Sequence, residues 1–172
     1  LAPCCDKLFH CRLCHDEQSN HKINRHEIKK IKCKKCLYLQ DVKQYCEICN
    51  HTMGEYFCSI CNLFDNEDKG QYHCEGCGIC RVGGRENFIH CNRCNSCITK
   101  SLYENHNCIE NVMNDVCPIC RTDLFQSTDQ VSILKCGHYM HQECMRSMFQ
   151  TDNPTISSFR CPTCQKTMID LS

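Results

Sequence analysis

The sequence has no tryptophan, only 7 glycines and 4 prolines, and no long apolar run. A membrane-spanning helix needs roughly 20 consecutive apolar residues, so the chain is not expected to cross a membrane. Its large apolar residues are also spread too thinly along 172 residues to form one large core. Modules without such a core are held together by disulfides or structural metals. The 23 cysteines and 10 histidines are therefore expected to carry the fold.

The cysteine spacing distinguishes between these two kinds of crosslink. Cys-x-x-Cys, the usual half of a zinc site, occurs ten times. A secreted disulfide scaffold has scattered spacings and a signal peptide, and the cysteine total here is odd. The pattern therefore indicates zinc and a reducing compartment, and we expect the protein in the cytoplasm and nucleus. Because Leu1 is not a methionine, we also expect the chain to begin inside a longer protein.

An internal repeat lies in the middle of the chain, where "HCEGCGIC" at 73–80 returns as "HCNRCNSC" at 90–97. Adjacent side chains on extended backbone point to opposite sides, so His73 and Cys74 are expected to serve different ions. Two Cys-x-x-Cys hairpins make a natural zinc site, and each remainder then passes to the next site. The sets expected on this basis are Cys58, Cys61, Cys74 and Cys77; then His73, Cys80, Cys91 and Cys94; then His90, Cys97, His106 and Cys108.

The last cysteine-rich block supplies eight ligands, enough for two closed tetrahedral sites with no position left for water. Such sites are structural, so no catalytic residue is expected. The spacing alone leaves open whether the ligands pair in sequence or cross over. The eight residues are Cys117, Cys120, Cys136, His138, His141, Cys144, Cys161 and Cys164.

Regular secondary structure is expected to be sparse. Apolar spacing predicts a helix over 141–150, followed by a loop around Pro154, and weak alternation predicts a strand over 130–136. The stretch 22–32 is either a short strand or an exposed basic segment. The stretch "IENVMND" at 109–115 is either a linker or a short helix.

The octet, with "CPIC", "CGHYMHQEC" and "CPTC", resembles a RING finger of the two-histidine kind. The resemblance implies crossed pairing: Cys117, Cys120, His141 and Cys144 on one zinc, and Cys136, His138, Cys161 and Cys164 on the other. It also implies that a ubiquitin-conjugating enzyme binds at Ile119, Met148 and Pro162, although Met148 could instead pack beneath the helix. The family often has a cation directly after the last zinc cysteine; this chain has Gln165, which weakens the expectation of full activity.

The earlier segments complete a larger resemblance. "LAPCCDKLFHCRLCHDEQSNH" resembles a CHY-type zinc finger, and the repeat resembles a CTCHY-type finger. The order CHY (1–53), CTCHY with linker (54–116), RING (117–165) and tail (166–172) resembles the E3 ligases related to the p53-induced two-histidine RING ligase and its plant homologues. The expected fold is a set of small zinc-stabilised modules with little regular secondary structure, including a cross-brace RING with one short helix and a small β-hairpin.

In the CHY segment the resemblance implies two complete sites and one incomplete site. Cys11 and Cys14 lack the Cys-x-His pair that the family supplies upstream, and His10 or His26 could substitute, although ordinary surface histidines are favoured. Seven complete Zn²⁺ sites are expected along the whole chain. The two complete sites of this segment are Cys4, Cys5, His15 and His21, and Cys33, Cys36, Cys46 and Cys49.

The leading hypothesis is a RING-type E3 ubiquitin transferase, whose N-terminal zinc platform binds a protein substrate for ubiquitination and proteasomal degradation. The alternative is a metal- or redox-responsive interaction module, which could be part of a larger iron-regulatory ligase. The formal net charge is zero, and seven filled sites would leave about seven negative charges because thiolates outnumber the zinc charges. Nucleic acid is therefore a disfavoured partner, and the basic run at 29–35 is expected to be a solvated face.

Overall fold

The computed structural model describes the chain except for residues 126, 128, 151–158 and 169–172. The loop predicted around Pro154, and the end of the tail predicted at 166–172, lie outside the described residues. The chain divides into two compact units, Leu1–Glu86 and Asn87–Ser172, which are described separately.

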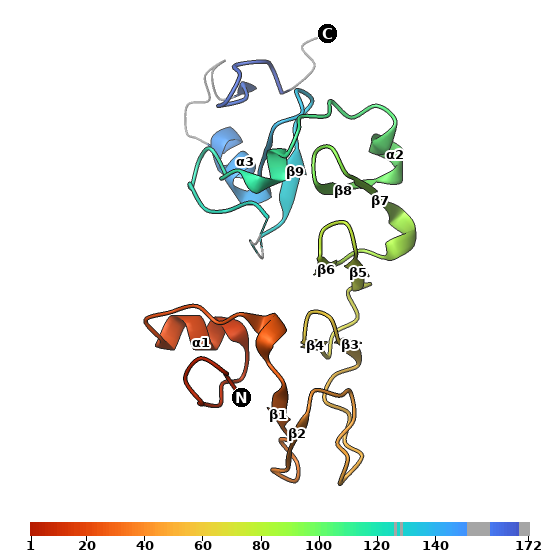
Figure 1. The fold of residues 1–172 in the computed structure, drawn as a ribbon. Coiled ribbons are helices and arrows are strands. Elements are labelled where there is room, and N and C mark those ends of the chain that lie inside the picture. Colours follow the sequence, from red (N-terminus) through yellow and green to blue (C-terminus); the bar gives the residue numbers. More distant parts are fainter. Residues whose placement is uncertain (126, 128, 151–158, 169–172) are drawn as a thin grey trace. The chain divides into compact units, whose positions relative to one another are not determined.

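The first unit is built of short two-stranded antiparallel hairpins joined by loops (Figure 1). One short helix, α1, comes before them, and a 3₁₀ turn at Arg25–Glu27 lies between. Every strand is three residues long, which is too short to be stable without another constraint. The elements are α1 (Arg12–Gln18), β1 (Lys30–Lys32), β2 (Leu39–Asp41), β3 (Tyr56–Cys58), β4 (Leu63–Asp65), β5 (Tyr72–Cys74) and β6 (Ile79–Arg81).

Seven of the ten Cys-x-x-Cys motifs share one backbone conformation. In these seven the residue after the second cysteine has a positive φ: Leu37, Asn50, Asn62, Gly78, Asn95, Arg121 and Gln165. In the turn before Asn50, for example, the Asn50 amide donates to the Cys46 carbonyl at 2.9 Å. The left-handed region costs an ordinary side chain about 1–2 kcal/mol, whereas glycine and asparagine adopt it readily. The sequence therefore suits the turn at four of these positions and is strained at Leu37, Arg121 and Gln165.

The second unit has longer elements and begins with a 3₁₀ turn, Arg85–Asn87, at its border. Two hairpins, β7–β8 and β9–β10, are followed respectively by helices α2 and α3 (Figure 1). The elements are β7 (Phe88–Cys91), β8 (Ser96–Thr99), α2 (Lys100–Tyr103), a 3₁₀ turn (Val112–Asn114), β9 (Val131–Ile133), β10 (Tyr139–His141) and α3 (Gln142–Phe149).

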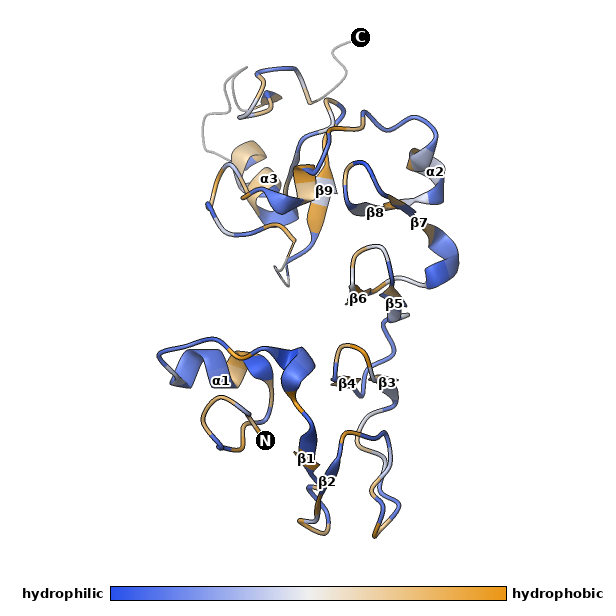
Figure 2. Cartoon of the chain, viewed as in Figure 1, coloured by the Kyte–Doolittle hydropathy of each residue, from blue (hydrophilic) through white to orange (hydrophobic). Residues whose placement is uncertain are grey.

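A hydrophobic core is present in the second unit. Figure 2 shows apolar segments around β9 and α3. Ile98 of β8, Val112 and Met113 are buried there with residues of the RING segment such as Leu134 and Met140. The stretch 109–115 therefore contains a short 3₁₀ turn whose side chains help to form the core. The end of the repeat and the RING segment share one packed interior.

A close backbone approach also joins these two segments of the second unit. The Asn107 side chain donates to the Lys135 carbonyl. A Cβ at Gly137 would lie only 2.1 Å from the Asn107 carbonyl oxygen, and Gly137 has a φ of +92°. Both the space and the backbone conformation at this position therefore require glycine.

The main secondary-structure predictions are confirmed. The helix predicted over 141–150 is α3, and the strand predicted over 130–136 contains β9. The basic stretch 22–32 ends in strand β1. Within the described part of the chain, no helix has the length and apolar character needed to cross a bilayer.

Candidate metal centres

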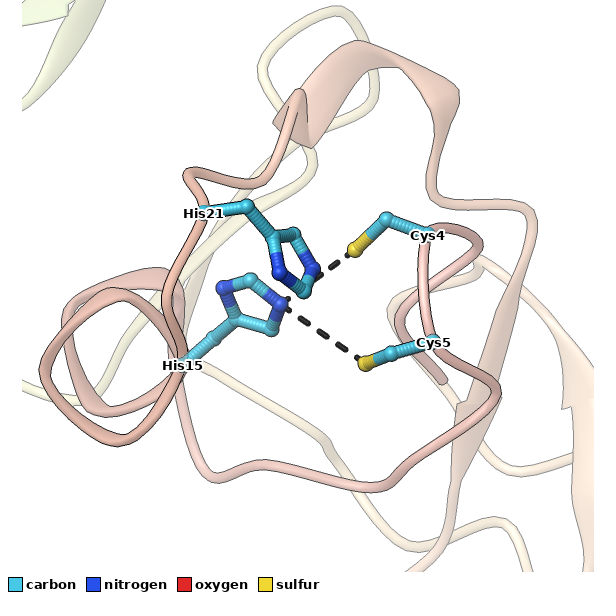
Figure 3. Close-up of side chains that lie close together, drawn as sticks. All are labelled: Cys4, Cys5, His15 and His21. Atoms are coloured by element: carbon cyan, nitrogen blue, oxygen red, sulfur yellow. Dashed lines mark hydrogen bonds between the residues drawn. The ribbon is translucent and has the colours of Figure 1, made fainter.

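The first centre gathers two cysteines from the N-terminal loop, one histidine from α1 and one from the loop after α1. The sulfur atoms of Cys4 and Cys5 lie 3.2 Å and 3.7 Å from His15 Nε2 (Figure 3). The His15 and His21 rings lie 4.9 Å apart in an edge-to-face arrangement. These four residues form a group able to hold one ion, as predicted.

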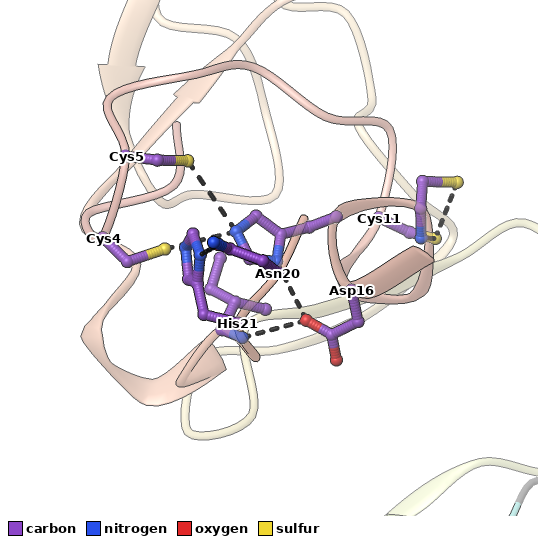
Figure 4. A network of polar contacts seen from close by, with 9 residues as sticks. Cys4, Cys5, Cys11, Asp16, Asn20 and His21 are labelled. Carbon is purple, nitrogen blue, oxygen red and sulfur yellow. Dashed lines mark hydrogen bonds and ion pairs between the residues drawn. The ribbon is translucent and has the colours of Figure 1, made fainter. Parts of the chain in front are cut away.

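Asp16 orients the first centre. Its carboxylate oxygen lies 2.9 Å from His15 Nδ1 and also accepts a hydrogen bond from the Ile23 amide at 2.9 Å (Figure 4). A proton on Nδ1 leaves Nε2 with a lone pair aimed at the sulfurs, which is the arrangement a metal-binding histidine needs. The hydrogen bond from His15 is the main cause that lowers the pKa of Asp16.

The second centre consists of four cysteines carried by two facing turns. Sulfur–sulfur distances are 3.7 Å between Cys33 and Cys49 and 3.4 Å between Cys36 and Cys46. The grouping is the predicted one. The Cys49 amide is the main cause that lowers the pKa of Cys46 to about 6, with the Ile48 amide adding to it and burial opposing it. Amide donors of this kind favour the thiolate form that binds metal.

The third centre corrects the prediction for the repeat. His73 Nδ1 lies 3.6 Å, 3.4 Å and 4.0 Å from the sulfurs of Cys58, Cys61 and Cys80. These four form one group, and the Tyr56 hydroxyl donates to Cys80 at 3.3 Å. The predicted set of Cys58, Cys61, Cys74 and Cys77 is therefore wrong, as is the set that joined His73 and Cys80 to Cys91 and Cys94.

Another centre, in the second unit, corrects the remaining set. Cys91 lies 3.7 Å from Cys108, and Cys94 lies 4.0 Å from His106 Nε2. These four form one group, so the predicted set of His90, Cys97, His106 and Cys108 is wrong. His106 Nδ1 donates to the Tyr103 carbonyl at 2.6 Å, which directs Nε2 toward the sulfurs.

The physical reason for both corrections is the register of the hairpins. His73 pairs with Cys80 across β5 and β6, and His90 pairs with Cys97 across β7 and β8. Cross-strand partners lie on the same face of a hairpin, and the next residue, Cys74 or Cys91, points to the opposite face. Each His–Cys pair therefore contributes both of its donor atoms to one ion. The pair of His73 and Cys80 joins Cys58 and Cys61, which lie in the turn that precedes it. The expectation that His73 and Cys74 serve different ions is confirmed.

In the RING segment the ligands are interleaved. Cys120 lies 3.2 Å from His141 Nδ1, and the sulfurs of Cys117 and Cys120 both contact Cys144. Burial, followed by these two contacts, raises the pKa of Cys144 to about 12. The arrangement matches the first set that the RING resemblance implies.

The second RING set consists of the other four ligands of this block. Cys136 lies 3.5 Å from His138 Nδ1, and its sulfur contacts those of Cys161 and Cys164. Burial is the main cause that raises the pKa of Cys136, to about 11. Ligands 117 and 120 therefore pair with 141 and 144, while 136 and 138 pair with 161 and 164.

The geometry of these groups fits zinc. A tetrahedral ion with Zn–S bonds of about 2.3 Å holds its sulfurs about 3.8 Å apart. The sulfur–sulfur distances of 3.4–3.7 Å and the sulfur–nitrogen distances of 3.2–4.0 Å lie around that value. Soft thiolates with imidazoles are the ligands of structural zinc, and four such donors leave no open position.

Cys11 and Cys14 form a pair whose sulfurs lie 3.3 Å apart. Cys11 is the N-cap of α1 and accepts a hydrogen bond from the Cys14 amide. The pair therefore lies in the first turn of α1. Of the candidate substitutes, His26 Nδ1 lies 2.9 Å from the Ile60 carbonyl.

The three residues expected to contact a conjugating enzyme all lie beside the RING centres. Ile119, between Cys117 and Cys120, is 42% exposed, and Pro162 is half-buried. Met148 is half-buried on α3 and packs partly against the hydrophobic core. The packing role considered for Met148 is therefore present, and its binding role stays a prediction.

Comparison with known families finds matches for an N-terminal and a C-terminal segment of the chain. Residues 1–56 match the CHY zinc finger family model, and residues 115–165 match the Ring finger domain model. The chain contains a CHY zinc finger and a RING finger. The crossed ligand sets and the β9–β10 hairpin followed by α3 lie within the RING match.

Relatives with the same zinc-rich region include several plant proteins. The chain is 46% identical, over 99% of its length, to the E3 ubiquitin-protein ligase SRFP1 of Oryza sativa subsp. japonica, and 45% identical to the E3 ubiquitin-protein ligase RZFP34 of Arabidopsis thaliana. It is 43% identical to a zinc finger protein BRUTUS-like of Arabidopsis thaliana. It spans 65%, 60% and 13% of the lengths of these three proteins.

The ligand sets can be tested by replacing zinc with ¹¹³Cd and recording ¹H–¹¹³Cd correlation spectra. We expect one cadmium signal to correlate with Cys58, Cys61, His73 and Cys80 together, because their donor atoms meet in one group. A cadmium that correlates with both Cys58 and Cys74 would restore the sequence-based grouping and contradict the structure.

Metal removal should unfold both units. The first unit has only three-residue strands, and structural zinc sites supply about 10–16 kcal/mol each in isolated finger peptides. A strong chelator is therefore expected to collapse the dispersion of the ¹H–¹⁵N spectrum throughout the chain, and readdition of zinc should restore it. A metal-free chain that keeps the native dispersion of its ¹H–¹⁵N spectrum would contradict this expectation.

Proposed function

We propose that this chain is the zinc-rich region of a RING-type E3 ubiquitin ligase. Its RING finger would recruit a conjugating enzyme charged with ubiquitin, and its N-terminal fingers would bind the protein substrate. The RING family match carries the proposal, and two relatives at 45–46% identity that are named E3 ubiquitin-protein ligases support it.

The chemistry suits a protein that positions reactants. Both RING ligand sets have four donors, so their ions have no open coordination position with which to activate water. The nucleophile in ubiquitin transfer is a substrate lysine, and the thioester is carried by the conjugating enzyme. The ligase contributes by holding these partners close together in a reactive orientation.

The docking surface would be centred on Ile119. This side chain is held by the turn between Cys117 and Cys120, where the Arg121 amide donates to the Cys117 carbonyl at 2.9 Å. An apolar residue on a metal-fixed turn loses little conformational freedom when it is buried by a partner. Pro162 occupies the corresponding turn between Cys161 and Cys164, and Met148 lies on α3.

Gln165 differs in charge from the cation often found at this position in the family. Its side-chain amide donates to the Pro162 carbonyl at 3.3 Å, and its own carbonyl accepts from Arg160 at 3.3 Å. The side chain thus braces the same turn that carries Pro162. We propose that this turn supports ubiquitin transfer with a weaker contribution from position 165.

The proposal has three further parts. The chain binds seven zinc ions, its substrate is degraded by the proteasome, and the protein resides in the cytoplasm and nucleus. Native mass spectrometry of the intact chain would count the ions. Ubiquitinated products in cells would be expected to accumulate when the proteasome is inhibited.

A second candidate function, a metal- or redox-responsive interaction module, is favoured by one observation. The Cys11 and Cys14 thiols lie 3.3 Å apart and belong to none of the four-residue groups described above. Titration of the purified chain with Zn²⁺ would reveal a separate weak site there, lost in Cys14→Ala. A single class of tight sites unchanged by this substitution would rule this function out.

The ligase proposal predicts that Ile119→Ala abolishes polyubiquitin formation with purified activating and conjugating enzymes while zinc content stays unchanged. The substitution removes a central apolar contact. At the strongest positions of an interface, truncating such a side chain costs about 2 kcal/mol or more of binding free energy. Ile60→Ala is the matched control, because Ile60 is 57% exposed at the same place in another turn. Equal loss of activity in both variants would contradict a specific role for Ile119.

A further inference from the structure

A group of exposed apolar side chains surrounds the all-cysteine centre of the first unit. Leu37 and Ile48 are 64% and 66% exposed, the highest values among the exposed large hydrophobic residues described. Scattered exposed apolar residues are normal on a protein surface, but a contiguous group indicates an interaction site. We call this group the apolar patch; its members are Leu37, Tyr38, Leu39, Tyr45 and Ile48.

The ligand geometry places residues next to members of the patch at one centre. Leu37 directly follows Cys36 and Tyr45 directly precedes Cys46, and the sulfurs of these two cysteines are 3.4 Å apart. Ile48 precedes Cys49, whose sulfur lies 3.7 Å from that of Cys33. The two turns therefore both carry exposed apolar residues beside the ligands of one centre.

Leu37 has a second unusual property. It occupies the left-handed position after a Cys-x-x-Cys turn, with a φ of 63°, where asparagine or glycine stands in four equivalent turns. Its exposed side chain gains little from burial in return for this strain. Residues held in strained conformations cluster at functional sites, so an exposed leucine here points to a role in binding.

The charges beside the patch are positive. Both acidic residues between positions 30 and 50 already have lysine partners: Asp41 pairs with Lys30 at 2.8 Å and Glu47 pairs with Lys43 at 2.5 Å. Three further exposed lysines, Lys32, Lys34 and Lys35, have no ion pair among the residues that the structure describes. The uncompensated charge beside the patch is therefore basic.

We propose that the apolar patch and these three lysines form a docking surface for an acidic segment of a protein partner, one that carries apolar side chains among its carboxylates. The apolar side chains would pack on Leu37 and Ile48 and the carboxylates would meet the lysines. This inference rests on the proposed ligase function only in making the partner a substrate, and binding itself is independent of that function.

The test begins with a phage-displayed library of random peptides of about 12 residues, selected on the full zinc-loaded chain. We expect the selected peptides to combine acidic residues with aromatic or aliphatic ones. Their dissociation constants, measured by fluorescence anisotropy, should rise about 10-fold or more in the double variant Leu37→Asn, Ile48→Ser. Reversing charge with Lys34→Glu and Lys35→Glu should weaken binding several-fold and reduce its salt dependence.

Matched controls separate lost binding from lost folding. Leu37→Asn places a residue that favours the left-handed conformation in the turn, so zinc content and thermal midpoint should not fall. Ile60→Ser removes another isoleucine that is more than half exposed, in the next turn, and should leave peptide binding unchanged. Free polyubiquitin formation should also be unchanged in the double variant, because the RING finger is untouched.

Several results would overturn the proposal. These are selected peptides without acidic residues, peptides that bind the double variant as tightly as the wild type, or no selected peptide at all. Self-association of the wild type that the double variant loses would instead assign the patch to a second copy of the chain. If peptide binding behaves as expected while no ubiquitin transfer occurs, the docking surface stands and the ligase function falls.

Discussion

The close approach of thiols and imidazoles within small groups is the constraint on which the rest of this structure depends. Cys144 shows why such a group needs a cation, because burial and the neighbouring sulfurs raise its pKa to about 12. Several thiolates crowded in this way repel one another unless a metal replaces their protons. The short hairpins of the first unit exist because their ends are fixed at these groups. The same fixed turns hold Ile119 and Leu37 in place, exposed to solvent.

The two units meet this constraint differently. In the second unit a hydrophobic core that includes Ile98, Leu134 and Met140 packs beside the ligand groups, and the RING segment shares it with the end of the repeat. In the first unit the large side chains beside the all-cysteine centre stay on the surface. Surfaces built this way combine a rigid backbone with exposed apolar groups, which is a favourable combination for recognising a flexible partner segment.

Much of this arrangement could be predicted from the sequence, because ligand type and spacing restrict a zinc module strongly. The set of Cys4, Cys5, His15 and His21, the all-cysteine set and helix α3 are all as predicted. The predicted partition of the repeat is wrong because two Cys-x-x-Cys turns do not meet at one ion there. Spacing could not reveal that His73 pairs with Cys80 across a hairpin, since strand register depends on turn geometry. The alternation of His and Cys in "HCEGCGIC" is the available signal, because it places the first His and the last Cys of this stretch on the same face of a hairpin.

The most direct test of the account is X-ray absorption at the zinc edge of the purified, zinc-loaded chain. Because the groups are built from cysteine and histidine alone, with cysteine in excess, the account predicts an average of about three sulfurs and one nitrogen around each zinc, and no oxygen. Oxygen scatterers, or an average of about two sulfurs or fewer, would mean open or incomplete sites. That result would contradict the claim that closed structural metal centres hold this fold.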